Sequence, residues 1–273
     1  MRHVEHMAQG EYGVRFEWGP EGARRLMAGG EVTCLVVVDV LSFTTAVSVA
    51  VDAGTKVFPY AWRDESAVAF AAGRDAELAV GRRAVSAGSP WSLSPAALRR
   101  APFTPRLVLP SPNGSAIAAA AGTSGAVVAG CLRNAAAVGS WLAGQGYGAP
   151  GRPVAVVAAG ERWTDGGLRP ALEDLLGAGA IIAAVASAAG GTAGLSPEAA
   201  MAAASYTSCP DVASAVTDCA SGRELRGHGF AEDVAVAVEV GASEGVAVLV
   251  DGAFSFTDPA PSRIRGSAAT GGR

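Results

Sequence analysis

Five carboxylates stand just beyond the ends of two apolar runs, where a folded chain could use them for chemistry. Asp39 lies at the end of the run TCLVVVDV, and Glu161, Asp165, Glu173 and Asp174 follow the run VAVVA. A carboxylate beside buried strands is costly unless it is hydrogen-bonded, paired or bound to a cation. Mg²⁺ prefers such oxygen ligands and keeps several waters. The sequence therefore predicts a Mg²⁺ site, and with it the catalytic residues, at Asp39, Glu173 and Asp174. Helix capping and a favourable helix dipole are simpler roles for these acids, and both stay open.

Small polar residues after other apolar runs predict an anion site. Asn113, Gly114 and Ser115 stand between a strand-like and a helix-like segment. A glycine there lets the backbone approach a ligand closely, and the free N–H groups of a helix start favour negative charge. A tight turn without function would have the same sequence. The predicted substrate-binding residues are Ser42, Thr44, Thr45, Ser111, Asn113, Gly114, Ser115, Arg133 and Asn134. Asn134 also suits a helix N-cap, and Arg82 or Arg83 could meet a second anionic group.

Composition excludes several other functions. Lys+Arg is 21 and Asp+Glu is 25, and a net charge of −4 argues against a nucleic-acid partner or an anionic membrane surface. Lys56 is the only lysine, which excludes a Walker-type nucleotide site. Of the three histidines only His228 stands away from the N-terminus, too few for a zinc site or a Ser-His-Asp hydrolase. A small-molecule partner fits this charge balance better.

Cysteine usage and the apolar runs indicate a cytoplasmic protein. The four cysteines form no C-x-x-C pair and follow no secretory signal, so we expect reduced thiols. The longest weakly polar run, residues 177–191, is too short to span a bilayer and predicts a buried helix. We therefore expect no membrane partner. Assembly as a homodimer is left open.

Apolar runs alternate with alanine-rich stretches of helical length, which indicates an α/β protein. The expected class is a three-layer α/β/α fold with a mainly parallel sheet. Residues 12–18 alternate in polarity and predict an edge strand, expected to be antiparallel. The other predicted strands are 33–40, 56–60, 77–80, 106–109, 126–129, 154–158 and 246–250. The predicted helices are 44–51, 65–72, 115–121, 135–142, 171–187, 198–206, 212–220 and 231–240.

The length of 273 residues fits one large unit or two closely packed lobes. The glycine-rich stretch 144–151 predicts a boundary between an N-terminal α/β lobe, residues 1–150, and a C-terminal α/β lobe, residues 151–257. The two lobes would share the active-site crevice. Residues 81–105 are rich in Pro, Ser and Gly and predict a long loop with at most a helical turn near Ala96. Residues 258–273 have the composition of a flexible tail.

The order and spacing of several segments resemble the 2-phosphosulfolactate phosphatase family. These segments are VVVDVLSFTTAVSVAVDAG, SPNGSAIAAAA, AGCLRNAAAV, LEDLLGAGAII and GFAEDVAVAVEV, and they extend from Val36 to the last predicted strand. The resemblance implies a cytoplasmic Mg²⁺-dependent hydrolase of a small anionic phosphoester. The family reaction converts 2-phospho-3-sulfolactate and water to 3-sulfolactate and phosphate.

Two positions and one short stretch depart from the pattern that the resemblance implies. Ser42 stands where the family has arginine, and Ala159 where it has cysteine. The family's acidic-Arg-Gly stretch is here Gly81-Arg82-Arg83. A catalytically inactive ligand-binding or assembly protein on the same fold is therefore the alternative to a phosphatase.

Overall fold

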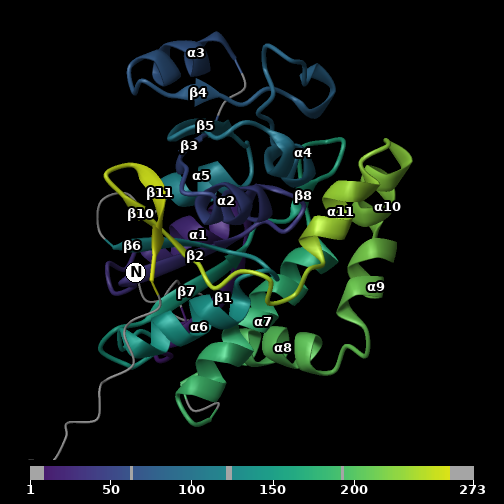
Figure 1. Ribbon diagram of the computed structural model, residues 1–273. Helices are drawn as coiled ribbons and strands as arrows, with labels where there is room; N and C mark the ends of the chain where they lie inside the picture. The colour runs from purple at the N-terminus through teal and green to yellow at the C-terminus, as the bar shows by residue number, and fades with distance from the viewer. Residues whose placement is uncertain (1–8, 62–63, 121–124, 192–193, 259–273) are drawn as a thin grey trace, which may run out of the picture.

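A single nine-stranded sheet forms the centre of the molecule, flanked by helices (Figure 1). The computed structural model describes residues 9–61, 64–120, 125–191 and 194–258. The strand order is β1-β7-β2-β6-β10-β11-β3-β5-β4. The strands are β1 Val14–Trp18, β2 Cys34–Val38, β3 Lys56–Tyr60, β4 Glu77–Leu78, β5 Arg106–Pro110, β6 Ala126–Gly130, β7 Val154–Ala158, β10 Val246–Val250 and β11 Ala253–Thr257. Strands β8 Glu161–Arg162 and β9 Leu168–Arg169 form a separate small hairpin. The predicted α/β class is confirmed.

Two parallel blocks make up most of the sheet, and an antiparallel hairpin joins them. Strands β1, β7, β2 and β6 are parallel to one another, as are β3, β5 and β4. The β10–β11 hairpin is antiparallel to β6 on one side and to β3 on the other. Three antiparallel junctions in succession mean that the two blocks run in opposite directions.

Alternate residues of β2 enter two different cores, which is the physical basis of the three layers. Val36 and Val38 pack with the helices on one face of the sheet, whereas Leu35 and Val37 pack with those on the other face. A strand buried on both faces needs an unbroken apolar sequence, as found here. The helices are α1 Gly19–Met27, α2 Phe43–Asp52, α3 Glu65–Ala72, α4 Pro95–Arg100, α5 Gly114–Ala120, α6 Ala135–Gly144, α7 Leu172–Ala188, α8 Pro197–Thr207, α9 Val212–Asp218, α10 Ala220–Gly227 and α11 Ala231–Ala237.

The structure corrects three details of the predicted elements. β1 is an edge strand as expected, but it is parallel to β7, because α1 follows it and carries the chain across the sheet. The predicted helix 212–220 breaks at Cys219 into α9 and α10. In the predicted loop 81–105, the helical segment near Ala96 is longer than the single turn expected, since α4 has six residues, and a short 3₁₀ turn, Arg82–Ala84, is added.

Strands from both sides of residue 150 share the one sheet. β7 lies between β1 and β2, and the β10–β11 hairpin lies between β6 and β3. A division of the chain at residue 150 therefore does not divide the sheet. Most of the tail, from residue 259 on, lies outside the described residues. Within the described ranges, none of the helices is both long and apolar enough to cross a lipid bilayer.

Candidate active site

Asp39 connects two turns that are distant in the sequence. It follows β2 directly, and its side chain is buried. Oδ1 accepts the N–H of Phe43, the first residue of α2, at 3.0 Å. Oδ2 accepts the N–H of Gly114, the first residue of α5, at 3.1 Å. Burial raises the pKa of Asp39, although these two backbone donors and Arg82 oppose the rise.

Gly114 lies between a buried strand and a helix, where the sequence predicts it, and the space beside it is filled. A Cβ at this position would lie 2.3 Å from Cδ1 of Phe43 and 2.9 Å from Oδ2 of Asp39. We expected the Gly114 N–H to face a ligand anion. In the structure this donor is used by the carboxylate of Asp39, which satisfies the same preference for negative charge at a helix start.

Two further acids follow at the start of α7, and both are buried. Asp174 accepts the N–H of Val40 at 2.7 Å and the N–H of Gly160 at 2.8 Å, so it holds the ends of β2 and β7 together. Burial and the charges of Glu173 and Asp39 raise the pKa of Asp174. Glu173 accepts a hydrogen bond from Sγ of Cys219 at 3.2 Å.

Glu161 is the fourth acid of this cluster and borders a pocket. Nδ2 of Asn113 donates to its Oε2 at 3.3 Å and to the carbonyl oxygen of Gly160 at 3.4 Å. Burial and the nearby charges of Asp39 and Glu173 raise the pKa of Glu161 to about 7. Glu161 can therefore take up or release a proton near neutral pH.

Arg82 brings a cation to the cluster from the loop after β4. Its Nε donates to Oδ2 of Asp233 at 2.9 Å, and a terminal nitrogen donates to Oγ of Ser42. Asp233 is buried at the start of α11 and also accepts from Ser94. Because Asp233 fixes the guanidinium, Arg82 stands beside the turn that carries Asp39 and Ser42.

The predicted hydroxyl residues divide into two groups. Thr44 donates to the carbonyl oxygen of Asp39 at 2.8 Å, and Thr45 donates to that of Val40 at 2.8 Å. Both threonines therefore stabilise the turn before α2. Ser115 is different, because its Oγ is buried and has no hydrogen-bond partner among the described residues. Ser111 is buried at the end of β5, where its N–H donates to the carbonyl oxygen of Tyr60.

The structure does not bring Arg133 or Asn134 into this cluster. Arg133 pairs with Glu239 and with Asp52. Asp52 is the last residue of α2, whereas Asp39 lies before the first residue of that helix, so Arg133 and Asp39 lie at opposite ends of α2. Asn134 occupies the N-cap position of α6, but its side chain caps no helix N–H. It instead accepts from Cys131 N at 2.9 Å and donates to Ala129 O at 3.2 Å, which ties the turn after β6 together.

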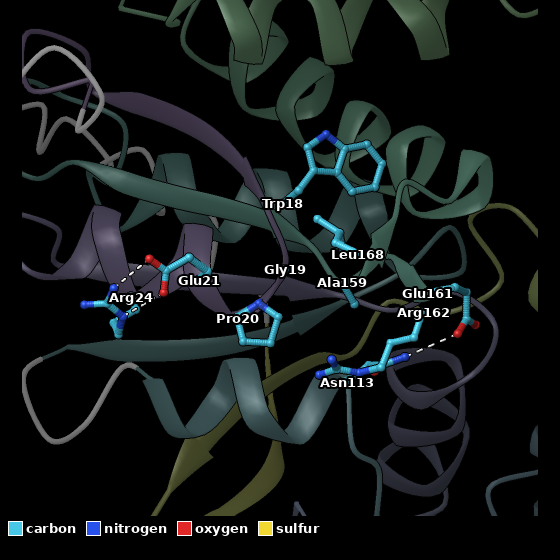
Figure 2. Close-up of a pocket in the computed structure, with 10 residues that line it drawn as sticks. All are labelled: Trp18, Gly19, Pro20, Glu21, Arg24, Asn113, Ala159, Glu161, Arg162 and Leu168. Carbon is cyan, nitrogen blue, oxygen red and sulfur yellow. Dashed lines mark hydrogen bonds and ion pairs between the residues drawn. The ribbon is translucent and has the colours of Figure 1, made fainter. Parts of the chain in front are cut away.

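A pocket of about 370 Å³ opens beside Asn113 and Glu161 (Figure 2). Its other walls come from the end of β1, the first turns of α1 and the β8–β9 hairpin. These segments follow the carboxyl ends of β1 and β7, the position at which open α/β sheets bind ligands.

Residues 24–252 match the sequence model of the family described as 2-phosphosulpholactate phosphatase. The chain belongs to this family. No curated protein matches the chain. The match covers the whole acidic cluster, from Asp39 in the turn after β2 to Asp233 in α11.

The donor set of this family member fits a weakly held Mg²⁺ better than a closed metal site. Across the described ranges, no three His, Cys, Asp or Glu side chains gather in a way that would hold a metal ion. Mg²⁺ is often bound by one or two carboxylates together with waters and substrate phosphate oxygens. Burial and mutual repulsion raise the pKa values of Asp39, Glu161 and Asp174, and a cation bound among these acids would favour their charged forms.

Two residues of the site in this family member, Glu161 and Asp233, are not among the predicted catalytic, substrate-binding or metal residues. Glu161 stands in the predicted acidic cluster, but nothing in the sequence distinguishes it from Asp165, which is exposed. Asp233 is visible only as an acid in a first helical turn, and its contact with Arg82 spans about 150 residues of chain. A contact of that sequence separation leaves no local signal, so only the fold reveals it.

Proposed function

We propose that this protein is a Mg²⁺-dependent phosphatase that hydrolyses a small phosphate monoester at the Asp39–Glu161 cluster. Membership of a phosphatase family supports the reaction class. One observation supports the location of the site: the turns that begin α2 and α5 both donate a backbone N–H to Asp39. A pocket lined by Asn113 and Glu161 lies beside them. Family resemblance points to 2-phospho-3-sulfolactate as the reference substrate.

The proposed metal site uses Asp39 with Glu173 or Asp174. Both oxygens of Asp39 and both oxygens of Asp174 accept backbone hydrogen bonds, so either acid would hold the metal through its remaining lone pairs. Glu173 accepts only from Sγ of Cys219 among the described residues, which makes it the more accessible ligand. A bound Mg²⁺ would neutralise phosphoryl charge and allow a phosphate dianion to approach four acids. The protein itself would hold the phosphate with Arg82, Asn113 and the unpartnered Oγ of Ser115.

In the proposed reaction a water oxygen forms a bond to phosphorus while the ester P–O bond breaks. The attacking oxygen keeps one proton of the water and becomes the hydroxyl of hydrogen phosphate. The leaving oxygen takes a proton from the proton donor and departs as an alcohol, and the second water proton restores the donor. Glu161 suits the proton donor, since a pKa of about 7 keeps part of its population protonated at neutral pH. Catalysis of phosphoryl transfer otherwise consists of positioning and electrostatic stabilisation.

The test is phosphate release from a panel of small phosphate monoesters, 2-phospho-3-sulfolactate included, with Mg²⁺ and with a chelator. A phosphatase should release phosphate from at least one ester, and the chelator should abolish the release. Binding of phosphate without turnover of any ester would instead favour the inactive ligand-binding protein. The sequence reason for that alternative is that Ser42 and Ala159 stand at the positions where the family resemblance implies Arg and Cys.

A further inference from the structure

The pocket beside the acidic cluster has a wall that the proposed phosphate chemistry does not use. Trp18, Pro20 and Leu168 form this wall, while Asn113 and Glu161 lie on the side toward the cluster (Figure 2). A ligand whose phosphate lies near Asp39 would therefore extend its organic part toward Trp18 and Leu168.

Leu168 is held in place by close backbone contacts although 43% of it is exposed. A Cβ at Gly160 would lie 2.8 Å from Cδ1 of Leu168, and a Cβ at Gly19 would lie 3.2 Å from it. Both glycines have positive φ, of 65° and 66°, so other residues would be strained there. Two glycines thus let the β9 strand bring a leucine side chain against the pocket.

The charges in the pocket largely cancel. Arg24 donates to both carboxylate oxygens of Glu21, at 2.9 and 2.6 Å. Arg162 donates to the carbonyl oxygen of Gly166 at 3.2 Å, and no carboxylate of the described chain lies within ion-pair distance of it. Glu161 has no ion-pair partner among the described residues either, so the lining holds one unpaired cation, Arg162, and one unpaired acid, Glu161, beside a wall of apolar side chains.

We propose that this pocket binds the organic part of the substrate and that this part is an apolar alkyl or aryl group. The inference rests on the proposed phosphatase function, but it replaces the reference substrate, 2-phospho-3-sulfolactate, which carries three anionic groups, by an ester with an apolar group. A compact substrate with several anionic groups would place strong charges against Trp18 and Leu168 with only Arg162 to meet them. An apolar group would bury its surface there, and the phosphate would remain the one strongly charged group.

The experiment measures binding by titration calorimetry with the full chain and Mg²⁺. The probes are phenylphosphonate, methylphosphonate and phosphonoacetate, which carry the same phosphonate on an aryl, a minimal and an anionic group. Leu168→Asp changes the wall, Leu168→Met preserves it, and Trp163→Ala is the matched control. Trp163 is 57% exposed on the same hairpin and does not line the pocket.

Phenylphosphonate should bind about tenfold more tightly than methylphosphonate, because a phenyl ring buried on the wall contributes roughly that much. In Leu168→Asp the affinities for phenylphosphonate and methylphosphonate should lie within about threefold of each other. Leu168→Met and Trp163→Ala should keep the tenfold difference of the parent. Equal affinities in the parent, tighter binding of phosphonoacetate, or no binding of any phosphonate would overturn the inference.

A second measurement separates this inference from the proposed function. Phenyl phosphate and phosphoglycolate are the esters that correspond to the aryl and anionic probes. Faster phosphate release from phosphoglycolate would overturn the apolar substrate class and leave the phosphatase standing. Selective binding of phenylphosphonate without hydrolysis of either ester would support the preference of the pocket for an apolar group and would exclude the proposed phosphatase function.

Discussion

The N–H of Gly114 donates to Oδ2 of Asp39 at 3.1 Å, and this contact joins the turn after β5 to the turn after β2. The two turns belong to parallel blocks that run in opposite directions in the sheet. α5 packs against both β2 and α1, so the helix itself carries the second turn to the first. The candidate site depends on this junction.

Gly114→Ala should destabilise the protein by about 1–3 kcal/mol and weaken phosphate binding, because the new Cβ would overlap Phe43 and crowd Asp39. Denaturant unfolding gives the first quantity and calorimetric titration with phosphate the second. Gly88→Ala is the control, since a Cβ there meets no atom within 4 Å. Equal effects of the two substitutions would show that the close approach at Gly114 is unimportant.

Asp39→Asn should reduce Mg²⁺ binding and turnover by far more than twofold, because it removes a carboxylate from the proposed metal site. It also replaces one of two acceptor oxygens by an NH₂ group, which cannot accept the Phe43 or Gly114 N–H. Mg²⁺ titration and steady-state kinetics measure both effects. Values within about twofold of the parent would refute the metal assignment.

Glu161 predicts how stability depends on pH. Its pKa rises from 4.5 to about 7 on folding, so the folded chain holds the proton more tightly than the unfolded chain. The free energy of unfolding should therefore fall as pH rises from about 4.5 to about 7, by on the order of 1–3 kcal/mol. Glu161→Gln should lack the part of this decrease in the free energy of unfolding that is due to Glu161. The variant should therefore be more stable than the parent at pH 8. Identical pH–stability curves for the two proteins would contradict the assignment.

If Glu161 donates the proton in the reaction, the same substitution has a kinetic consequence. Activity of the parent should decline above about pH 7 as Glu161 ionises. Glu161→Gln should lower kcat strongly and remove that decline. Retention of both the rate and the decline would assign the proton transfer to another group.

Arg82→Lys should raise KM for the ester by about tenfold or more while the protein stays folded. Lysine keeps the charge but cannot donate to Asp233 and Ser42 in the geometry of a guanidinium. Arg83→Lys is the neighbouring control, because Arg83 is exposed on the same turn. A KM unchanged by Arg82→Lys would exclude a role in phosphate binding.

Asp233→Asn tests the support behind Arg82. The substitution leaves the guanidinium without its buried anionic partner, so the free energy of unfolding should fall by about 3 kcal/mol. A loss much below 1 kcal/mol would mean that the pair contributes little to the fold. Thermal unfolding of the parent and variant measures the difference.

The sequence predicts the elements well where burial alone decides them. β3, β7, β10 and α3 have the predicted bounds. β7 and β10 are unbroken apolar runs, and α3 begins directly after its N-cap residue Asp64. It misses α1, whose first residues Gly19 and Pro20 have the composition of a loop. It also misses the orientation of β1, which depends on that helix.

The candidate site is predictable only in part, for a physical reason. Polar residues that follow apolar runs identify Asp39, Asn113 and Asp174, because a strand end is a local feature. The pairing of Arg82 with Asp233 and of Arg133 with Glu239 depends on contacts across more than 100 residues. The sequence therefore predicts Arg133 at the substrate, whereas the fold pairs it with Asp52 and Glu239, outside the acidic cluster.

A crystal structure of the protein grown with MgCl₂ and phosphate tests the central claim most directly. The account predicts phosphate within hydrogen-bond distance of Asn113, Ser115 or Arg82, with Mg²⁺ joining it to Asp39 and the pocket of Trp18 and Leu168 open beside it. Phosphate bound at another place, with Mg²⁺ absent from Asp39 at concentrations that saturate activity, would contradict the phosphatase site.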